Sequence, residues 1–372
     1  MTKMDINTTL SIKKETLNAL IELLQKRGYQ TIGPKIKDHT LACLPIDSIE
    51  DLPYGYISEQ EKGYYRLLEG KHKRYFDIVP GQQSWKQYLF PPRSELIKSQ
   101  RQNGKWKETP LQGEPPKYAF IGVRPCDSAA ICVQDRVFIR KDFTDPIYHE
   151  RRQNLLIITV NCLHPAATCF CASMNTGPKA DTGFDLSLTE LDDVFVVEIG
   201  SDAGQDIMKN LKCEPASATQ LKEMELGFTK AVDQMQRKID NLQNVPQLLI
   251  NNLDHSLWQE VGERCLSCTN CTLVCPTCFC WDTEDLTGLM DGVSQRDRIW
   301  DSCFNPSYTA QSFGAIHTST KARYRQWLTH KMSTWKEQFG TLGCTGCGRC
   351  IVWCPAKIDI TEEINKFQEA LA

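Results

Sequence analysis

The stretch CLSCTNCTLVCP, from Cys265 to Pro276, places four cysteines at gaps of two, two and three residues and ends in proline. The same spacing recurs in CTGCGRCIVWCP, from Cys344 to Pro355. Gaps of two residues let three thiols converge from one tight turn, while the fourth cysteine points away along the following segment. Each stretch therefore presents three thiols to one metal centre. The two stretches together determine how the C-terminal part of the chain folds.

This spacing is typical of bacterial ferredoxins, whose cysteines hold [4Fe–4S] clusters. Two complete copies predict two clusters, and in two-cluster ferredoxins the fourth cysteine of each run binds the other cluster. We therefore expect Cys265, Cys268, Cys271 and Cys354 on one cluster, and Cys344, Cys347, Cys350 and Cys275 on the other. Zinc is the alternative, because paired cysteines also bind it, but zinc requires no crossing fourth cysteine followed by proline.

A further group of cysteines follows two apolar runs in the first half of the chain. Cys126 comes after residues 117–123, and Cys162, Cys169 and Cys171 come after residues 155–160. Ligand sites of parallel sheets gather beyond the carboxyl ends of the strands. We expect these four thiols to meet there and to hold a third [4Fe–4S] cluster. The alternative is that they pack as small hydrophobic side chains.

Six cysteines remain outside these groups. Cys278 and Cys280 belong to a TCFC sequence that also occurs at residues 168–171, and Cys303 lies in the segment between the two runs. These three could pack beside a cluster, donate hydrogen bonds to it or replace one of the assigned ligands, and packing is the favoured interpretation. Cys43, Cys132 and Cys213 stand alone and are expected to be buried thiols.

The rest of the sequence predicts an α+β protein. The apolar, β-rich runs 117–123, 155–160 and 193–200 read as buried strands, and the segment between the first two reads as a helix. This alternation suggests a partly parallel sheet. We expect an α/β domain over residues 1–255 and a mainly helical, ferredoxin-like dicluster domain over residues 256–372. Residues 218–250 are expected to form one long helix that Pro246 bends or ends, and residues 307–339 are also expected to be helical.

Composition excludes several classes of partner. The net charge of -3 gives no reason to expect nucleic acid. No apolar run approaches the length of about 20 residues that spans a bilayer. We place the chain in the reducing cytoplasm, where eighteen cysteines argue for metal ligation rather than disulfides. There is no glycine-rich dinucleotide fingerprint and no P-loop.

Several longer motifs resemble one family. They are GVRPCDSAAI, NCLHPAATCFCASMNTGP, DLSLTEL, RIWDSC and the two cysteine runs. They resemble the beta subunits of soluble cytoplasmic [NiFe] hydrogenases of the sulfhydrogenase type, over about residues 117–358. They also resemble the related A subunit of anaerobic sulfite reductase.

The resemblance implies an electron-relay subunit, which carries no catalytic site of its own, within a hetero-oligomeric oxidoreductase. Its partners would be a flavin subunit that uses NAD(P)H and the small and large subunits of the [NiFe] hydrogenase. In the sulfite reductase alternative the terminal partner carries a sirohaem. A non-redox scaffold with structural metals and a free-standing ferredoxin are further alternatives, and the large α/β domain disfavours the last.

Overall fold

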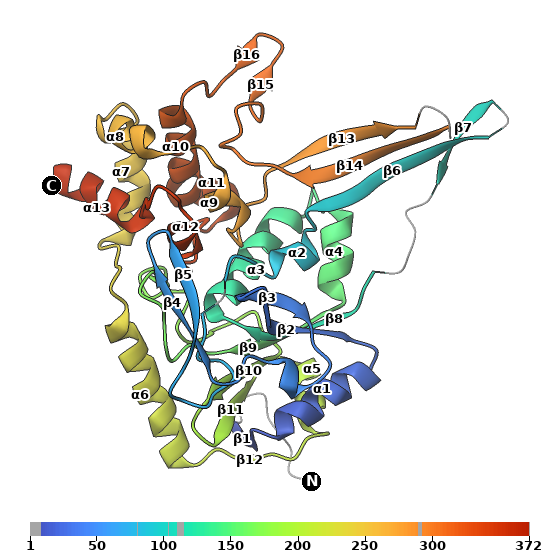
Figure 1. The fold of residues 1–372 in the computed structure, drawn as a ribbon, viewed down its shortest axis with the longest axis vertical. Coiled ribbons are helices and arrows are strands. Elements are labelled where there is room, and N and C mark those ends of the chain that lie inside the picture. The colour runs from blue at the N-terminus through green and yellow to red at the C-terminus, as the bar shows by residue number, and fades with distance from the viewer. Residues whose placement is uncertain (1–8, 80, 103, 110–114, 289–291, 372) are drawn as a thin grey trace.

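A mixed eight-stranded sheet forms the centre of the N-terminal part in this computed structural model, which describes residues 9–371 except 80, 103, 110–114 and 289–291 (Figure 1). The inner strands β10, β9, β8 and β2 run parallel, and the outer neighbours pair antiparallel. Across the sheet the order is β12 (Glu214–Pro215), β1 (Leu10–Lys13), β11 (Val194–Ile199), β10 (Leu186–Glu190), β9 (Leu155–Val160), β8 (Tyr118–Val123), β2 (Gln30–Lys37) and β3 (Thr40–Pro45).

Helices cover both faces of this sheet, which explains why its central strands β8 and β9 are almost entirely apolar. Every residue of β8 is buried. Leu20 of α1 and Met208 of α5 pack on one face, and Ile131 of α3 and Tyr148 of α4 pack on the other. The bounds are α1 (Thr16–Lys26), α2 (Lys86–Leu89), α3 (Pro125–Phe138), α4 (Pro146–Gln153), α5 (Asp202–Met208) and α6 (Ala218–Gln234).

The cysteine-rich part is mainly helical and packs around its own core, in which Trp258, Leu328 and Ile364 are buried. Its elements are α7 (Val245–Asn251), α8 (Leu257–Arg264), α9 (Asn270–Leu273), α10 (Thr320–Thr329), the π-helical turn η3 (His330–Thr334), α11 (Trp335–Phe339), α12 (Arg349–Val352) and α13 (Ile360–Ala370). The α+β prediction is confirmed. The domain boundary at residue 255 stays a prediction. No helix in the described ranges is long and apolar enough to cross a membrane.

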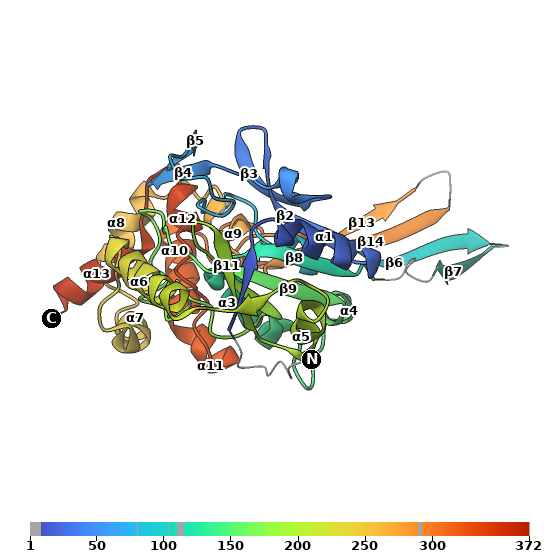
Figure 2. The same ribbon diagram turned by 90° about the horizontal axis from the view of Figure 1, so that it is seen from below.

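A four-stranded antiparallel arm projects from the body in both views (Figures 1 and 2). It joins strands from both halves of the chain, because β14 pairs with β6. Its strands are β13 (Trp281–Thr287), β14 (Val293–Trp300), β6 (Arg93–Gln102) and β7 (Lys105–Thr109). Two small hairpins complete the fold: β4 (Tyr56–Glu61) with β5 (Tyr64–Glu69), and β15 (Ala310–Gln311) with β16 (Gly314–Ala315).

Two helical predictions were wrong in their extent. The helix expected over residues 218–250 ends at Gln234, and a new helix begins at Val245 with Pro246 in its first turn. Proline is suited to that place, since its missing N–H has no helical partner there. In the segment 307–339 only residues from Thr320 onward are helical, and the earlier part forms the β15–β16 hairpin.

The second cysteine run lies directly against the upstream TCFC segment. The Phe170 amide donates to the Gly346 carbonyl at 2.9 Å, and the Thr176 hydroxyl donates to the Thr345 carbonyl at 2.7 Å. Gly346 has φ +65°, and a Cβ there would come within 2.6 Å of the Cys171 backbone. Only glycine fits both the backbone angle and this approach.

We predict that Gly346→Ala destabilises the folded chain by about 2–4 kcal/mol, because left-handed strain adds to overpacking. Gly28→Ala is the matched control: its φ is +81°, but nothing lies within 4 Å of the position that a Cβ would take. It should lose only the conformational part, about 1–2 kcal/mol. Anaerobic thermal or urea unfolding measures both variants. Equal losses would contradict the tight contact with Cys171.

Candidate metal centres

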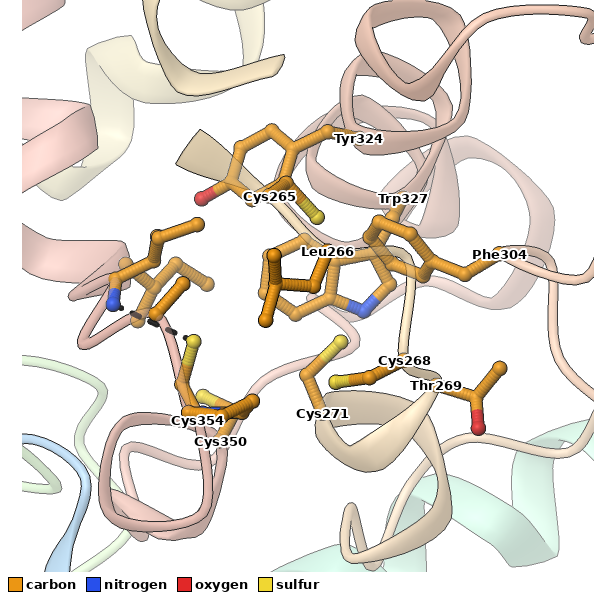
Figure 3. Close-up of a pocket in the computed structure, with 14 residues that line it drawn as sticks. Cys265, Leu266, Cys268, Thr269, Cys271, Phe304, Tyr324, Trp327, Cys350 and Cys354 are labelled. Atoms are coloured by element: carbon orange, nitrogen blue, oxygen red, sulfur yellow. Dashed lines mark hydrogen bonds between the residues drawn. The ribbon is translucent and has the colours of Figure 1, made fainter. Parts of the chain in front are cut away.

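The first predicted quartet surrounds one cavity. Cys265, Cys268, Cys271 and Cys354 all line it, and Cys350 lies at its edge (Figure 3). The sulfurs of this quartet come from the loop before α9, from α9 itself and from the segment after α12. Three aromatic side chains, Phe304, Tyr324 and Trp327, close the rest of the cavity and make its surroundings apolar. Cys268 is exposed, so this cavity lies at the surface of the molecule.

The second predicted quartet surrounds a neighbouring cavity. Cys344, Cys347, Cys350 and Cys275 line it, together with Phe170 from the upstream TCFC segment. Cys350 and Trp327 line both cavities, so the two sites are adjacent. Burial raises the pKa of Cys344 to about 12. Its thiol is therefore neutral until a metal binds, and binding must release protons.

The two runs have the same backbone conformation. In each, the residues two and four positions after the first cysteine have positive φ: Ser267 and Thr269 in one run, Gly346 and Gly348 in the other. This turn aims an amide at the first sulfur, with Ser267 N 3.5 Å from Cys265 Sγ and Gly346 N 3.4 Å from Cys344 Sγ. Such N–H groups stabilise the charge of a thiolate-bound cluster. The donor set and the backbone therefore both fit [4Fe–4S] clusters.

A buried lysine that the sequence reasoning missed serves the second site. The Lys331 ammonium lies 3.4 Å from Cys275 Sγ and 3.5 Å from Cys278 Sγ, and it donates to the Gly343 carbonyl at 2.9 Å. Burial opposes its charge, but the neighbouring sulfurs of Cys275 and Cys278 outweigh burial and raise its pKa. A cation at this place offsets the negative charge of cysteine thiolates.

Lys331 could have been found from its position in the sequence. Trp327, Lys331 and Trp335 follow one another at intervals of four residues, which places them on one face of a helix. A lysine between two tryptophans on a buried face requires an anionic partner, because an unpaired buried charge is costly. The cysteines supply that partner.

Arg349, which stands between Cys347 and Cys350 in the sequence, pairs with a buried aspartate. Its guanidinium forms a two-pronged ion pair with Asp127 at 2.8 and 2.9 Å, and the two side chains are 3% and 1% exposed. Asp127 lies in the first turn of α3, next to Cys126. The pair therefore fastens the second cysteine run to the α/β part of the chain.

The four thiols at the strand ends lie near one another. Burial and the neighbouring sulfurs of Cys169 and Cys162 raise the pKa of Cys171. Burial, Asp127 and Cys171 likewise raise the pKa of Cys126. These interactions link Cys171 to each of the other three thiols, and the convergence of all four beyond β8 and β9 stays a prediction. Whether these thiols hold a third cluster stays a prediction, as do the ligand roles of the other eight cysteines.

The zinc alternative would place the sulfurs of one quartet around a single ion. In the ranges the structure describes, no three His, Cys, Asp or Glu side chains converge closely enough to hold one ion. Zinc would need its sulfur ligands at about 2.3 Å from one point. The thiols of both quartets instead surround a space, as a multinuclear cluster requires.

Comparison with known proteins agrees with this chemistry. A family model described as a 4Fe-4S dicluster domain matches residues 264–358, which include both cysteine runs. The sulfhydrogenase 2 subunit beta of Pyrococcus furiosus is 31% identical over 294 residues, which are 77% of this chain and 83% of that protein. No solved structure matches the chain.

We predict that Asp127→Asn lowers the free energy of unfolding by about 3–5 kcal/mol, because it leaves the buried Arg349 charge without a counter-ion. Asp285→Asn is the matched control, since Asp285 pairs with Arg296 at 2.6 Å but both side chains are more than half exposed. Water screens that pair, so its loss should change little. Anaerobic unfolding followed by circular dichroism measures both; a loss of the same size in both variants would contradict the clamp.

Proposed function

The chain belongs to the family of the sulfhydrogenase beta subunits, and from this premise we propose a specific relay. Single electrons pass through its [4Fe–4S] clusters between a flavin subunit that uses NAD(P)H and the small subunit of a [NiFe] hydrogenase. The observation that carries the proposal is the adjacency of two cavities, each lined by one of the expected quartets and sharing Cys350 and Trp327. Electron transfer falls steeply with distance, so adjacency is the property a relay needs.

The ligands we propose are the crossed sets. Cys265, Cys268, Cys271 and Cys354 hold one cluster, and Cys344, Cys347, Cys350 and Cys275 hold the other. Each bound cluster supplies a one-electron couple. A third cluster on Cys126, Cys162, Cys169 and Cys171 is a further part of the proposal, supported by the mutual proximity of these buried thiols.

The protein's own contribution is to bury the thiolates and to set their electrostatic surroundings. The Ile358 amide lies 3.3 Å from Cys354 Sγ, and the amides of Ser267 and Gly346 approach Cys265 and Cys344. N–H donors and nearby cations favour the more negative, reduced form and so raise a reduction potential. Lys331 acts on the second site in this way.

The chemistry of hydride and of hydrogen belongs to partner subunits in this proposal. The chain has no dinucleotide fingerprint, so a partner chooses between NADH and NADPH. We also place the complex in the cytoplasm, with support from the eighteen cysteines, all of which are free thiols. Co-purification with a sirohaem subunit instead of a nickel subunit would contradict the proposal.

We predict that Cys347→Ala in the assembled complex abolishes NAD(P)H-linked hydrogen turnover, because it removes a ligand of the second cluster. Hydrogen-dependent reduction of an artificial dye at the nickel subunit should persist, since that route bypasses this chain. NAD(P)H-linked hydrogen turnover and hydrogen-dependent dye reduction are measured on the same preparation. Unchanged NAD(P)H-linked turnover would refute the relay.

Cys132→Ala is the control for this experiment. Cys132 is also a partly buried cysteine, but it lines neither cavity. Both activities should survive in this variant. Loss of both activities in Cys347→Ala would mean that the complex had failed to assemble, and size-exclusion chromatography with subunit analysis separates that outcome from a broken relay.

A further inference from the structure

A third cavity is lined by three cysteines that neither ferredoxin-like run uses. Cys278, Cys280 and Cys303 share it with Lys331 and Trp327. The space within its lining is about 660 Å³, compared with about 480 Å³ at the first quartet and 320 Å³ at the second. The cavity therefore has room for a group as large as those that the other two are expected to hold.

The local fold explains how three thiols reach this cavity. Cys278 and Cys280 lie two residues apart in the segment between Pro276 and β13, and residues two apart in extended chain share one side. Strand β14, which pairs with β13 through Trp281 and Trp300, delivers Cys303 to the base of the same hairpin. The Asp301 amide donates to the Cys280 carbonyl at 3.0 Å and continues this pairing.

Two buried lysines lie beside this segment, and one of them, Lys331, lines the cavity. Lys331 lies 3.5 Å from Cys278 Sγ, and Lys86 donates to the Cys278 carbonyl at 3.2 Å. The two side chains are only 3% and 4% exposed. Their hydrogen bonds go to sulfurs, carbonyls and a hydroxyl rather than to carboxylates. Lys331 lines the cavity, and a buried cation there is stable only if negative charge lies nearby, whereas Lys86 lies outside the lining and has the Trp300 ring as a further partner at 3.8 Å.

We propose that Cys278, Cys280 and Cys303 hold an additional iron–sulfur cluster of the [4Fe–4S] class. Three thiolates bind three irons, and the fourth iron takes a ligand that is not cysteine; the imidazoles of His317 and His330 line the same cavity. Cys280 and Cys303 share a hydrogen bond, and Cys278 shares one with Cys275 of the second quartet, so the three thiols lie among close sulfur neighbours.

The new centre adjoins the relay but does not depend on it. Trp327 lines all three cavities, and Lys331 lines the second and the third. Electrons could therefore pass between the second and third centres across one side chain. The cavity is also lined by Tyr308 and Thr309, at the base of the β15–β16 hairpin, whose tip carries the exposed Phe313.

The test is metal analysis of the full chain, purified without oxygen, with Cys278, Cys280 and Cys303 all changed to serine. We expect this variant to hold four irons and four acid-labile sulfides fewer than the unchanged chain. The matched control changes Cys43, Cys132 and Cys213 to serine and should keep all its iron. The test compares the iron content of the variant with that of the unchanged chain. Its result therefore does not depend on whether the strand-end quartet also holds a cluster.

Three outcomes would overturn the proposal. Full iron in the triple variant would show that the three thiols hold no cluster. A loss of eight irons would show that the three cysteines serve the second quartet or the folding of the chain. If the unchanged chain held one zinc that the triple variant lacked, the three cysteines would bind a single ion and not a cluster. Electron paramagnetic resonance after dithionite reduction checks that the signals of the other clusters persist.

The single variant Cys303→Ser guards against a folding defect. It removes one ligand and leaves the segment that joins Cys275 to Cys280 intact. We expect an altered or lost signal from one cluster only, at unchanged circular dichroism and unchanged signals from the others. A spectrum identical to that of the unchanged chain would contradict a role for Cys303 in metal binding.

Discussion

The buried ion pair between Arg349 and Asp127 joins the two halves of this molecule. Charges this deep in a protein cost several kcal/mol each to desolvate, and they persist only when each has its partner. Arg349 stands between two cysteines of the second run, and Asp127 stands beside Cys126 at the start of α3. The second quartet therefore takes its shape only when the α/β part is folded beneath it, and the α/β part buries an unpaired carboxylate without that run.

Thiolates impose the remaining electrostatic demands. Burial raises the pKa of Cys271, Cys344 and Cys350, so metal binding at these thiols must compensate for both burial and deprotonation. The fold meets this demand with amides aimed at sulfur and with Lys331 beside Cys275. The contact between the second run and the upstream TCFC segment explains why that run has glycine at positions 346 and 348, where a side chain would meet the TCFC backbone. The first run carries Ser267 and Thr269 at the equivalent positions.

The features that could be predicted from the sequence are those that residues close together in the chain determine. Gaps of two residues determine where neighbouring thiols point, so the cysteines of each quartet could be listed before their cavities were seen. Strands β8 and β9 could be predicted because burial on both faces makes them apolar throughout. The arm could not, because β6 and β14 are nearly two hundred residues apart in sequence and their pairing leaves no local pattern. The breaks at Gln234 and before Thr320 were missed because helical periodicity does not reveal where tertiary contacts end a helix.

The repeated TCFC segment shows how one short sequence serves two places in the same electron-transfer subunit. Upstream, Phe170 lines the second cavity while Cys169 and Cys171 belong to the group of thiols at the strand ends. Downstream, Cys278 and Cys280 line the third cavity and Phe279 packs against Trp335. In both copies the two cysteines flank an aromatic ring that fills apolar space. The ring keeps water from the sulfurs, and a low dielectric strengthens the effect of each amide and lysine on the charge that the sulfurs carry. The second cavity is linked to both copies, since Phe170 of the upstream copy lines it and Lys331, which also lines it, contacts Cys278 of the downstream copy.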